Sequence, residues 1–138
     1  MALQRSNPEI GYIDTATARD LGLTHLIRAG DWLYLSGVAP VTTAEGSLKL
    51  VSPGDYRAQL SAVLEIIDRT LQTERASLAE VVSTTFYVRE VSEYIANVDV
   101  IKAAFGDELP TSTLVGVSAL FFQEQRVEVV AVAYHPVR

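Results

Sequence analysis

Hydrophobic residues spaced three and four positions apart predict a long helix in the middle of the chain. They fall on one stripe, which is typical of an amphipathic helix that packs on a core. The stripe comprises Tyr56, Leu60, Val63, Leu64, Ile67 and Leu71. Ser52 and Pro53 come directly before it, a pattern typical of a serine N-cap followed by a proline at the first helical position. We therefore expect the helix to begin at Pro53.

A second, shorter helix is predicted from about Ser92 onward. Its apolar positions again share one face, namely Tyr94, Val98, Ile101 and Phe105. Gly106 and Pro110 follow the last of these positions, and both residue types commonly end a helix. The chain therefore contains two amphipathic helices, each with a single apolar stripe.

Runs rich in β-branched and aromatic residues predict the strands. They span residues 25–28, 32–35, 81–89, 112–118 and 127–134, and a turn at 29–31 joins the first two as a hairpin. Residues 1–24 show no clear period, so we expect an extended arm with a turn near 20–22. Residues 38–51 are predicted to be a loop with room for a short strand.

The order of these elements, ββαβαββ, indicates an α+β domain covering residues 1–138. Two helices with one apolar stripe each should pack on one face of a single mixed sheet. The last strand remains apolar on its other face as well, since Val130 and Val132 alternate with Val129 and Ala131. A sheet face of this kind needs a cover, and a homo-oligomer would supply it. Any cleft would then lie at a subunit boundary.

Composition narrows the classes of function. A chain of 138 residues with 49% hydrophobic and 20% charged residues is typical of one globular domain. It contains no apolar run near the ~20 residues of a membrane span, and its first residues lack the apolar core of a signal peptide, so we expect a cytoplasmic protein without a membrane partner. The sequence has no cysteine, which excludes disulfides and thiolate chemistry. A net charge of −6 disfavours a nucleic-acid partner.

Several segments occur in the order found in the RidA/YjgF family of imine deaminases. They are GDWLYLSG at 30–37, EVVSTTFYVR at 80–89, YIAN at 94–97, PTSTLVGV at 110–117 and RVEVVAVA at 126–133. The chain resembles this family from about residue 22 to 135. The resemblance implies a chorismate-mutase-like fold, a homotrimer, and clefts between subunits that bind a small-molecule ligand.

The chain departs from the family pattern at the residues that carry catalysis. The arginine that grips a substrate carboxylate is replaced by Ser112. The other family positions are assigned as follows: the glutamate of the last strand to Val130, the tyrosine of the N-terminal arm to about Leu23, the glutamine after Ser-Gly to Val38, and the cysteine to Leu114. A guanidinium binds a carboxylate through two charge-assisted hydrogen bonds, which hydroxyls cannot reproduce. The cleft should therefore prefer a neutral ligand, or one whose charge is met by another group.

The remaining polar residues supply the candidate site. We assign Glu128 and Asn97 as catalytic candidates. The candidates for substrate binding are Ser36, Gly37, Arg28, Thr111, Ser112 and Thr113. Glu128 could act as a general base if burial raises its pKa, and the alternative is an edge or interface carboxylate paired with a basic residue. Arg28 is the best replacement cation.

His25 is the obvious acid–base group in a chain with two histidines. The alternative is a packing role at the surface or at an interface. Neither histidine has the spacing of a metal ligand, so no metal and no cofactor is expected.

Two functions follow from this pattern. The first is a cofactor-free enzyme that hydrolytically deaminates an enamine, an imine or a related amino-conjugated acid. The second is a non-catalytic trimer that binds a metabolite in the same cleft. A third, RNA cleavage, is disfavoured by the acidic charge.

Overall fold

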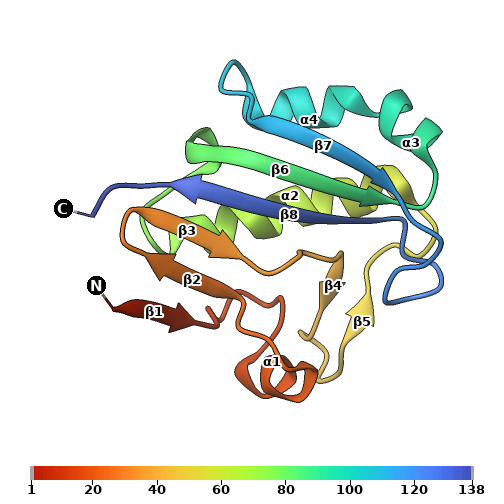
Figure 1. The fold of residues 1–138 in the computed structure, drawn as a ribbon. Coiled ribbons are helices and arrows are strands. Elements are labelled where there is room, and N and C mark those ends of the chain that lie inside the picture. The colour runs from red at the N-terminus through yellow and green to blue at the C-terminus, as the bar shows by residue number, and fades with distance from the viewer. Residues whose placement is uncertain (1, 138) are drawn as a thin grey trace.

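A six-stranded mixed sheet forms the centre of the computed structural model, which describes residues 2–137 (Figure 1). The strand order is β1-β2-β3-β8-β6-β7. The bounds are β1 Leu3–Ser6, β2 Leu26–Ala29, β3 Trp32–Leu35, β6 Val81–Val88, β7 Thr111–Gly116 and β8 Val127–Tyr134. Neighbouring strands run antiparallel except β6 and β7, which are parallel. The prediction of an α+β fold with a mixed sheet is confirmed.

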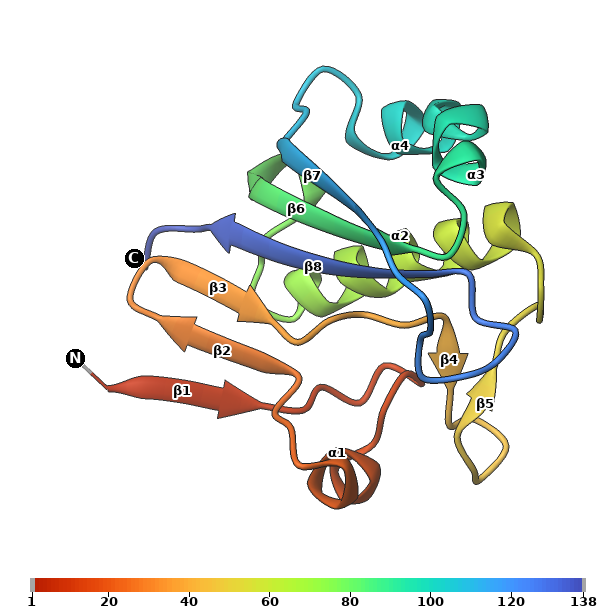
Figure 2. The same cartoon turned by 45° about the vertical axis from the view of Figure 1, so that its right-hand side comes forward.

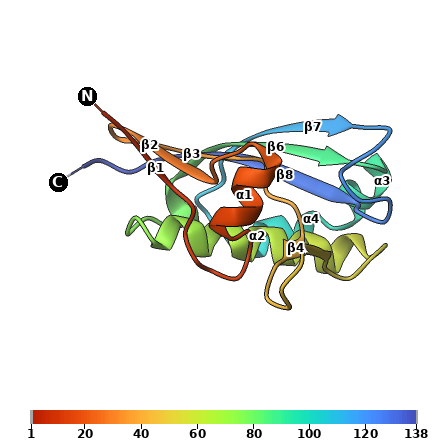
Figure 3. The ribbon, with the colours of Figure 1, turned by 90° about the horizontal axis from the view of Figure 1, so that it is seen from below.

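Three helices lie against one face of this sheet, as the view from below shows (Figure 3). They are α2 (Tyr56–Gln72), α3 (Val91–Ala96) and α4 (Val98–Phe105). A short helix α1 (Thr15–Leu21) and a two-stranded sheet of β4 (Val41–Thr42) and β5 (Lys49–Leu50) lie beyond the end of the main sheet (Figure 2). The one-turn helix η1 (Leu78–Glu80) leads into β6. The prediction that the amphipathic helices share one face is confirmed.

Helix α2 begins later than the sequence suggested. Its N-cap is Asp55, whose side chain accepts a hydrogen bond from the Ala58 N–H at 3.0 Å. Ser52 has a φ of 43° and lies in the turn before the helix. This turn binds another segment, because the Gly54 N–H donates to the Glu124 carbonyl at 2.9 Å. The tertiary contact therefore decides where the helix starts.

The second predicted helix is broken into α3 and α4. Asn97 lies at the break with φ −122° and ψ 22°, outside the helical region. The apolar stripe nevertheless continues across it, since Tyr94 packs on the core and Ile101 and Phe105 are buried. A break of this kind leaves the period of the stripe almost unchanged, which is why the sequence predicted one helix.

The N-terminal arm is more ordered than predicted, because it contains β1 and α1. Asp14 caps α1 by accepting from the Thr17 N–H at 2.7 Å, and Gly22 ends it with a φ of 75°. The expected turn near 20–22 is therefore the end of a helix. Only Ala18 of α1 is buried, so its seven residues carry no apolar stripe that could reveal it.

The second face of the sheet remains uncovered by any described element. On β8, Val127, Val129, Ala131 and Ala133 are buried beneath the helices, while the alternate residues are partly or largely exposed. Trp32 and Tyr34 of β3 pair with β8 and expose 40% and 47% of their surface. The rings of Trp32 and Tyr134 meet edge to face at 5.0 Å. This uncovered face, called the open face below, is rich in apolar side chains.

His25 lies in the core, which neither sequence-based alternative anticipated. It is 1% exposed, and its Nε2 lies 2.8 Å from the Thr70 Oγ1. The Thr70 hydroxyl already donates to the Ile66 carbonyl at 2.7 Å, so the Nε2 of His25 carries the hydrogen and donates. The Nδ1 then has a free lone pair, and no described residue bonds to it. Burial lowers the pKa of His25 from 6.5 to about 4.

We expect the fold to lose stability as the pH falls from about 6.5 to about 4. The unfolded chain binds a proton at His25 below pH 6.5, whereas the folded protein resists it until its own, lower pKa. The full shift corresponds to about 3 kcal/mol in the free energy of unfolding. Urea denaturation at pH 7 and pH 4.5 measures this loss in the wild type and in His25→Gln, which should lose less. Equal losses in the two proteins would contradict the assignment.

Candidate functional site

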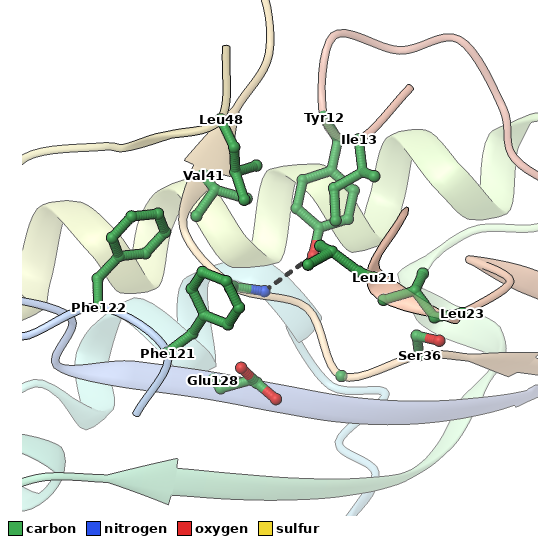
Figure 4. A pocket seen from close by; sticks show the side chains of 12 residues that line it. Tyr12, Ile13, Leu21, Leu23, Ser36, Val41, Leu48, Phe121, Phe122 and Glu128 are labelled. Atoms are coloured by element: carbon green, nitrogen blue, oxygen red, sulfur yellow. Dashed lines mark hydrogen bonds between the residues drawn. The ribbon is translucent and has the colours of Figure 1, made fainter. Parts of the chain in front are cut away.

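A pocket of about 330 Å³ opens where four segments meet at one end of the sheet. The N-terminal arm, the segment after β3, the β4–β5 pair and the loop before β8 each contribute to it (Figure 4). Its polar side chains are Tyr12, Ser36 and Glu128. The rest of the lining is apolar apart from Gly37: Ile13, Leu21, Leu23, Ala39, Val41, Leu48, Phe121 and Phe122.

Glu128 packs its carboxylate directly against Gly37. A Cβ atom placed on Gly37 would lie 2.5 Å from the Glu128 Oε2, closer than real contacts allow. The glycine therefore leaves room for the Glu128 carboxylate, and it is not needed here for a positive φ angle. The fully buried Gln125 directs its Nε2 at the Glu128 Oε1 from 3.4 Å and donates to the Val127 carbonyl at 3.1 Å. The carboxylate is held between the glycine and this amide.

Tyr12 brings a hydroxyl to the same pocket from the N-terminal arm. The Ala39 N–H donates to the tyrosine oxygen at 3.1 Å, which leaves the hydroxyl hydrogen available to a ligand (Figure 4). Burial, with a smaller contribution from the negative charge of Glu128, raises the pKa of Tyr12 to about 12, although the hydrogen bond from the Ala39 N–H acts in the opposite direction. The phenol is therefore a neutral donor at physiological pH.

The pocket contains a tyrosine and a glutamate, two residue types that the family resemblance assigned to other positions of this chain. The arm tyrosine was expected at about Leu23, but the structure brings Tyr12 into the pocket and places Leu23 beside it. The glutamate of the last strand was expected at Val130, yet Glu128 supplies a carboxylate in the pocket. The sequence offered a signal for the first, because Tyr12 is the one tyrosine of residues 1–24. Residues 1–24 show no hydrophobic period, however, so the sequence gave no register by which to match Tyr12 to the family tyrosine.

Gln59 anchors the loop that carries Phe121 and Phe122. It is fully buried on α2, and its Nε2 donates to the carbonyls of Ser52 and Glu124, both at 3.0 Å. Its Oε1 accepts from the Arg126 N–H at 2.7 Å. These bonds fasten both ends of the turn before β8 to the helix. The sequence gave no reason to single out a glutamine next to an apolar stripe.

Arg28 lies outside the pocket. Its Nε donates to the Glu74 carboxylate at 2.8 Å, and its Nη1 donates to the carbonyls of Gly30 and His135 at 3.0 and 2.9 Å. The guanidinium is thus bound at the opposite end of β2 and β3. The structure does not bring the expected replacement cation to Glu128.

Asn97 and the β7 hydroxyls also lie apart from Glu128 within one chain. Asn97 accepts from the Arg57 Nη1 at 3.1 Å and donates to the Glu93 carbonyl at 2.8 Å, in the helical layer. Ser112 lies 3.4 Å from the Tyr94 hydroxyl, on the helix side of β7. Its neighbours Thr111 and Thr113 point to the open face. Strand β6 separates all three from β8. Of the candidates, Ser36, Gly37 and Glu128 share the pocket, whereas Arg28, Asn97 and the β7 hydroxyls lie at other places in the chain.

Two further features of the described residues concern metals and membranes. Between residues 2 and 137, no three side chains of His, Cys, Asp or Glu gather closely enough to hold a metal ion. No helix in the same range has the length and apolar character needed to cross a bilayer.

Comparisons with known proteins agree with this fold. The family model described as Endoribonuclease L-PSP matches residues 16–135. RutC family protein PH0854 of Pyrococcus horikoshii is 30% identical over 108 residues, which cover 78% of this chain and 82% of the relative. The chain therefore belongs to the Endoribonuclease L-PSP family, which is also called the YjgF or RidA family.

Solved structures resemble the chain over almost its whole length. Rv2704 of Mycobacterium tuberculosis, a member of the YjgF/YER057c/UK114 family, is 26% identical with a TM-score of 0.78, covering 96% of this chain and 99% of its own. The Rid family protein YyfA of Yersinia pestis is 23% identical with a TM-score of 0.83, covering 96% and 99%. RidA of a Psychrobacter species is 20% identical with a TM-score of 0.81, covering 95% and 98%. The last two likenesses concern the fold alone.

Proposed function

We propose that this protein is a cofactor-free enzyme that hydrolyses an imine or enamine to a carbonyl compound and ammonia. One observation carries the proposal: the carboxylate of Glu128 and the neutral hydroxyl of Tyr12 line the same largely apolar pocket. A carboxylate accepts protons and a phenol donates a hydrogen bond, which are the two roles that water addition to a C=N bond requires.

The reaction needs only these groups and water. Glu128 accepts a proton from the attacking water as its oxygen bonds to the carbon of the protonated imine. The C=N electron pair moves to nitrogen, which becomes a neutral amine, and the Tyr12 hydroxyl donates a hydrogen bond to it. Glu128 then returns its proton to this amine in the tetrahedral intermediate. The C–N bond breaks, ammonia leaves, and the hydroxyl proton passes to water to give the carbonyl.

The proposed assembly is a homotrimer with clefts between subunits, and the open face supports it. Trp32, Tyr34 and Tyr134 expose apolar surface that another copy would bury. A neighbouring subunit could then bring the hydroxyls of its β7 strand towards the pocket.

We expect sedimentation equilibrium to give three times the mass of the 15.0 kDa chain. Val130→Lys places a charge on the open face and should shift the protein towards monomer, because an unpaired ammonium is costly to bury in an interface. Ile95→Ser changes an exposed residue of α3 and serves as the control. A wild-type protein that sediments as a monomer would contradict the proposed assembly.

Ammonia release from imines generated in place tests the activity. An amino-acid oxidase supplies 2-iminopropionate from alanine, and an amine oxidase supplies a ketimine that lacks a carboxylate. Acceleration of either hydrolysis over buffer supports an enzyme. Ligand binding without acceleration of either would support the second function, a metabolite-binding trimer.

The name of the family model includes endoribonuclease, but we do not propose RNA cleavage for this chain. Its net charge is −6, and no basic side chain of the described residues lines the pocket. Phosphate backbones are bound mainly through lysine and arginine.

A further inference from the structure

The charges around the pocket restrict its ligand. Glu128 is the one Asp, Glu, Lys, Arg or His side chain that lines it among residues 2–137. Two arginines beside the pocket are engaged elsewhere: Arg126 donates to the Glu93 carboxylate at 2.7 Å, and Arg89 donates to the Gln123 carbonyl. Arg19 lines a neighbouring hollow with Asn7 and Thr15 and is not part of this lining. A carboxylate on the ligand would thus face Glu128 with no cation of the same chain's lining to offset the repulsion, and the β7 residues 111–113 that a neighbouring subunit could add are hydroxyls.

The shape and lining of the pocket point to an apolar group on the ligand. Phe121 and Phe122 stand edge to face at 5.0 Å, and Val41 and Leu48 add further apolar surface to the same pocket (Figure 4). Phe121 is 64% exposed, a large apolar surface at the mouth of a pocket. An aromatic or branched aliphatic group would cover this surface and remove it from water.

We infer that the pocket takes a carboxylate-free imine that bears an aromatic or branched aliphatic substituent. This rests on the proposed function, and it names the substrate class. The C=N group lies at Glu128 and Tyr12. Neither the neutral imine nor its protonated form is repelled by the carboxylate there. The apolar substituent lies against Phe121. Such imines arise when a hydrophobic primary amine is oxidised, so an amine-oxidising reaction must supply the substrate.

Two imines that differ in a single group test this inference. Oxidation of 1-phenylpropan-2-amine gives a methyl ketimine, and oxidation of phenylalanine gives the imine in which a carboxylate replaces that methyl group. We expect kcat/KM for the methyl ketimine to be higher by about tenfold or more, because the carboxylate would face Glu128. Equal values, or a preference for the carboxylated imine, would overturn the inference.

Binding of the two carbonyl products separates this inference from the proposed activity. Phenylacetone should bind more tightly than phenylpyruvate in a calorimetric titration, whether or not either imine is hydrolysed. Selective binding without turnover would refute the deaminase and uphold the ligand class. Tighter binding of phenylpyruvate, or binding of neither compound, would overturn the ligand class.

Two variants locate the effect in the pocket. Phe121→Ala should weaken phenylacetone binding about tenfold, whereas Ile95→Ala, equally exposed on α3, should leave it unchanged. Glu128→Gln removes the charge and should narrow the difference between phenylacetone and phenylpyruvate. If the two affinities differ as much in Glu128→Gln as in the wild type, repulsion by this carboxylate is not the cause of the difference. That result would overturn the inference from charge.

Discussion

Glu128→Gln is expected to lower kcat/KM for imine hydrolysis by about 10²–10⁴-fold, the usual contribution of a general acid–base group. Glutamine keeps the size of the side chain and its hydrogen-bonding oxygen but cannot take the proton of the attacking water. The measurement is ammonia release from a ketimine generated in place, at substrate concentrations below KM. Thermal unfolding should change little, since the side chain is only partly buried.

Glu124→Gln is the matched control for this prediction. Glu124 lies four residues earlier, its side chain is exposed, and it lies outside the pocket lining. The same loss of one negative charge should therefore leave the rate unchanged. If both variants kept wild-type activity, water activation would have to come from another group, and Tyr12 would be the next residue to replace.

Gly37→Ala should lower the rate by about 10²-fold through displacement of the Glu128 carboxylate. The added methyl would lie 2.5 Å from the Oε2, so the carboxylate must move by about 1 Å to reach an ordinary contact. The fold should tolerate the change, because the φ of Gly37 is not positive and the atom that must move is the end of a flexible side chain. Activity and thermal unfolding of the same sample measure the two effects.

Gly116→Ala provides the matched control, since its added Cβ would make an ordinary 3.5 Å contact with the Val91 Cγ2. The double variant of Gly37→Ala and Glu128→Gln is the sharper test. If the methyl acts by displacing the carboxylate, it should cost little more once that carboxylate is gone. If the rate loss of the double variant equals the product of the two single losses, Gly37 contributes by another route, such as direct contact with the ligand.

Much of the fold could be predicted because its signals are local and repeated. The stripe from Tyr56 to Leu71 gave α2, and the β-branched run before Arg89 gave β6. The predicted start of α2 was wrong because Ser52 and Gly54 lie in a turn whose Gly54 N–H donates to the Glu124 carbonyl, a contact between residues far apart in the sequence. Helix α1 was missed because it buries a single residue.

The candidate site was only partly predictable. Ser36, Gly37 and Glu128 were expected to act together, and the structure brings them into one pocket. Arg28 was expected there too, but its partners Glu74 and His135 are distant in sequence and hold it at the other end of the strands. Sequence patterns identify which residues carry chemistry, but not which of them meet.

The sequence by itself determined the α+β class, the packing of its amphipathic helices on one face of a mixed sheet, and the family. Periodicity and short motifs encode these properties, because each depends on neighbours a few positions away. Only the tertiary structure decided that Tyr12 enters the pocket, that Gly37 leaves room for the Glu128 carboxylate, and that His25 is buried. Such features depend on segments that are distant in the chain and close in space, so no local pattern records them.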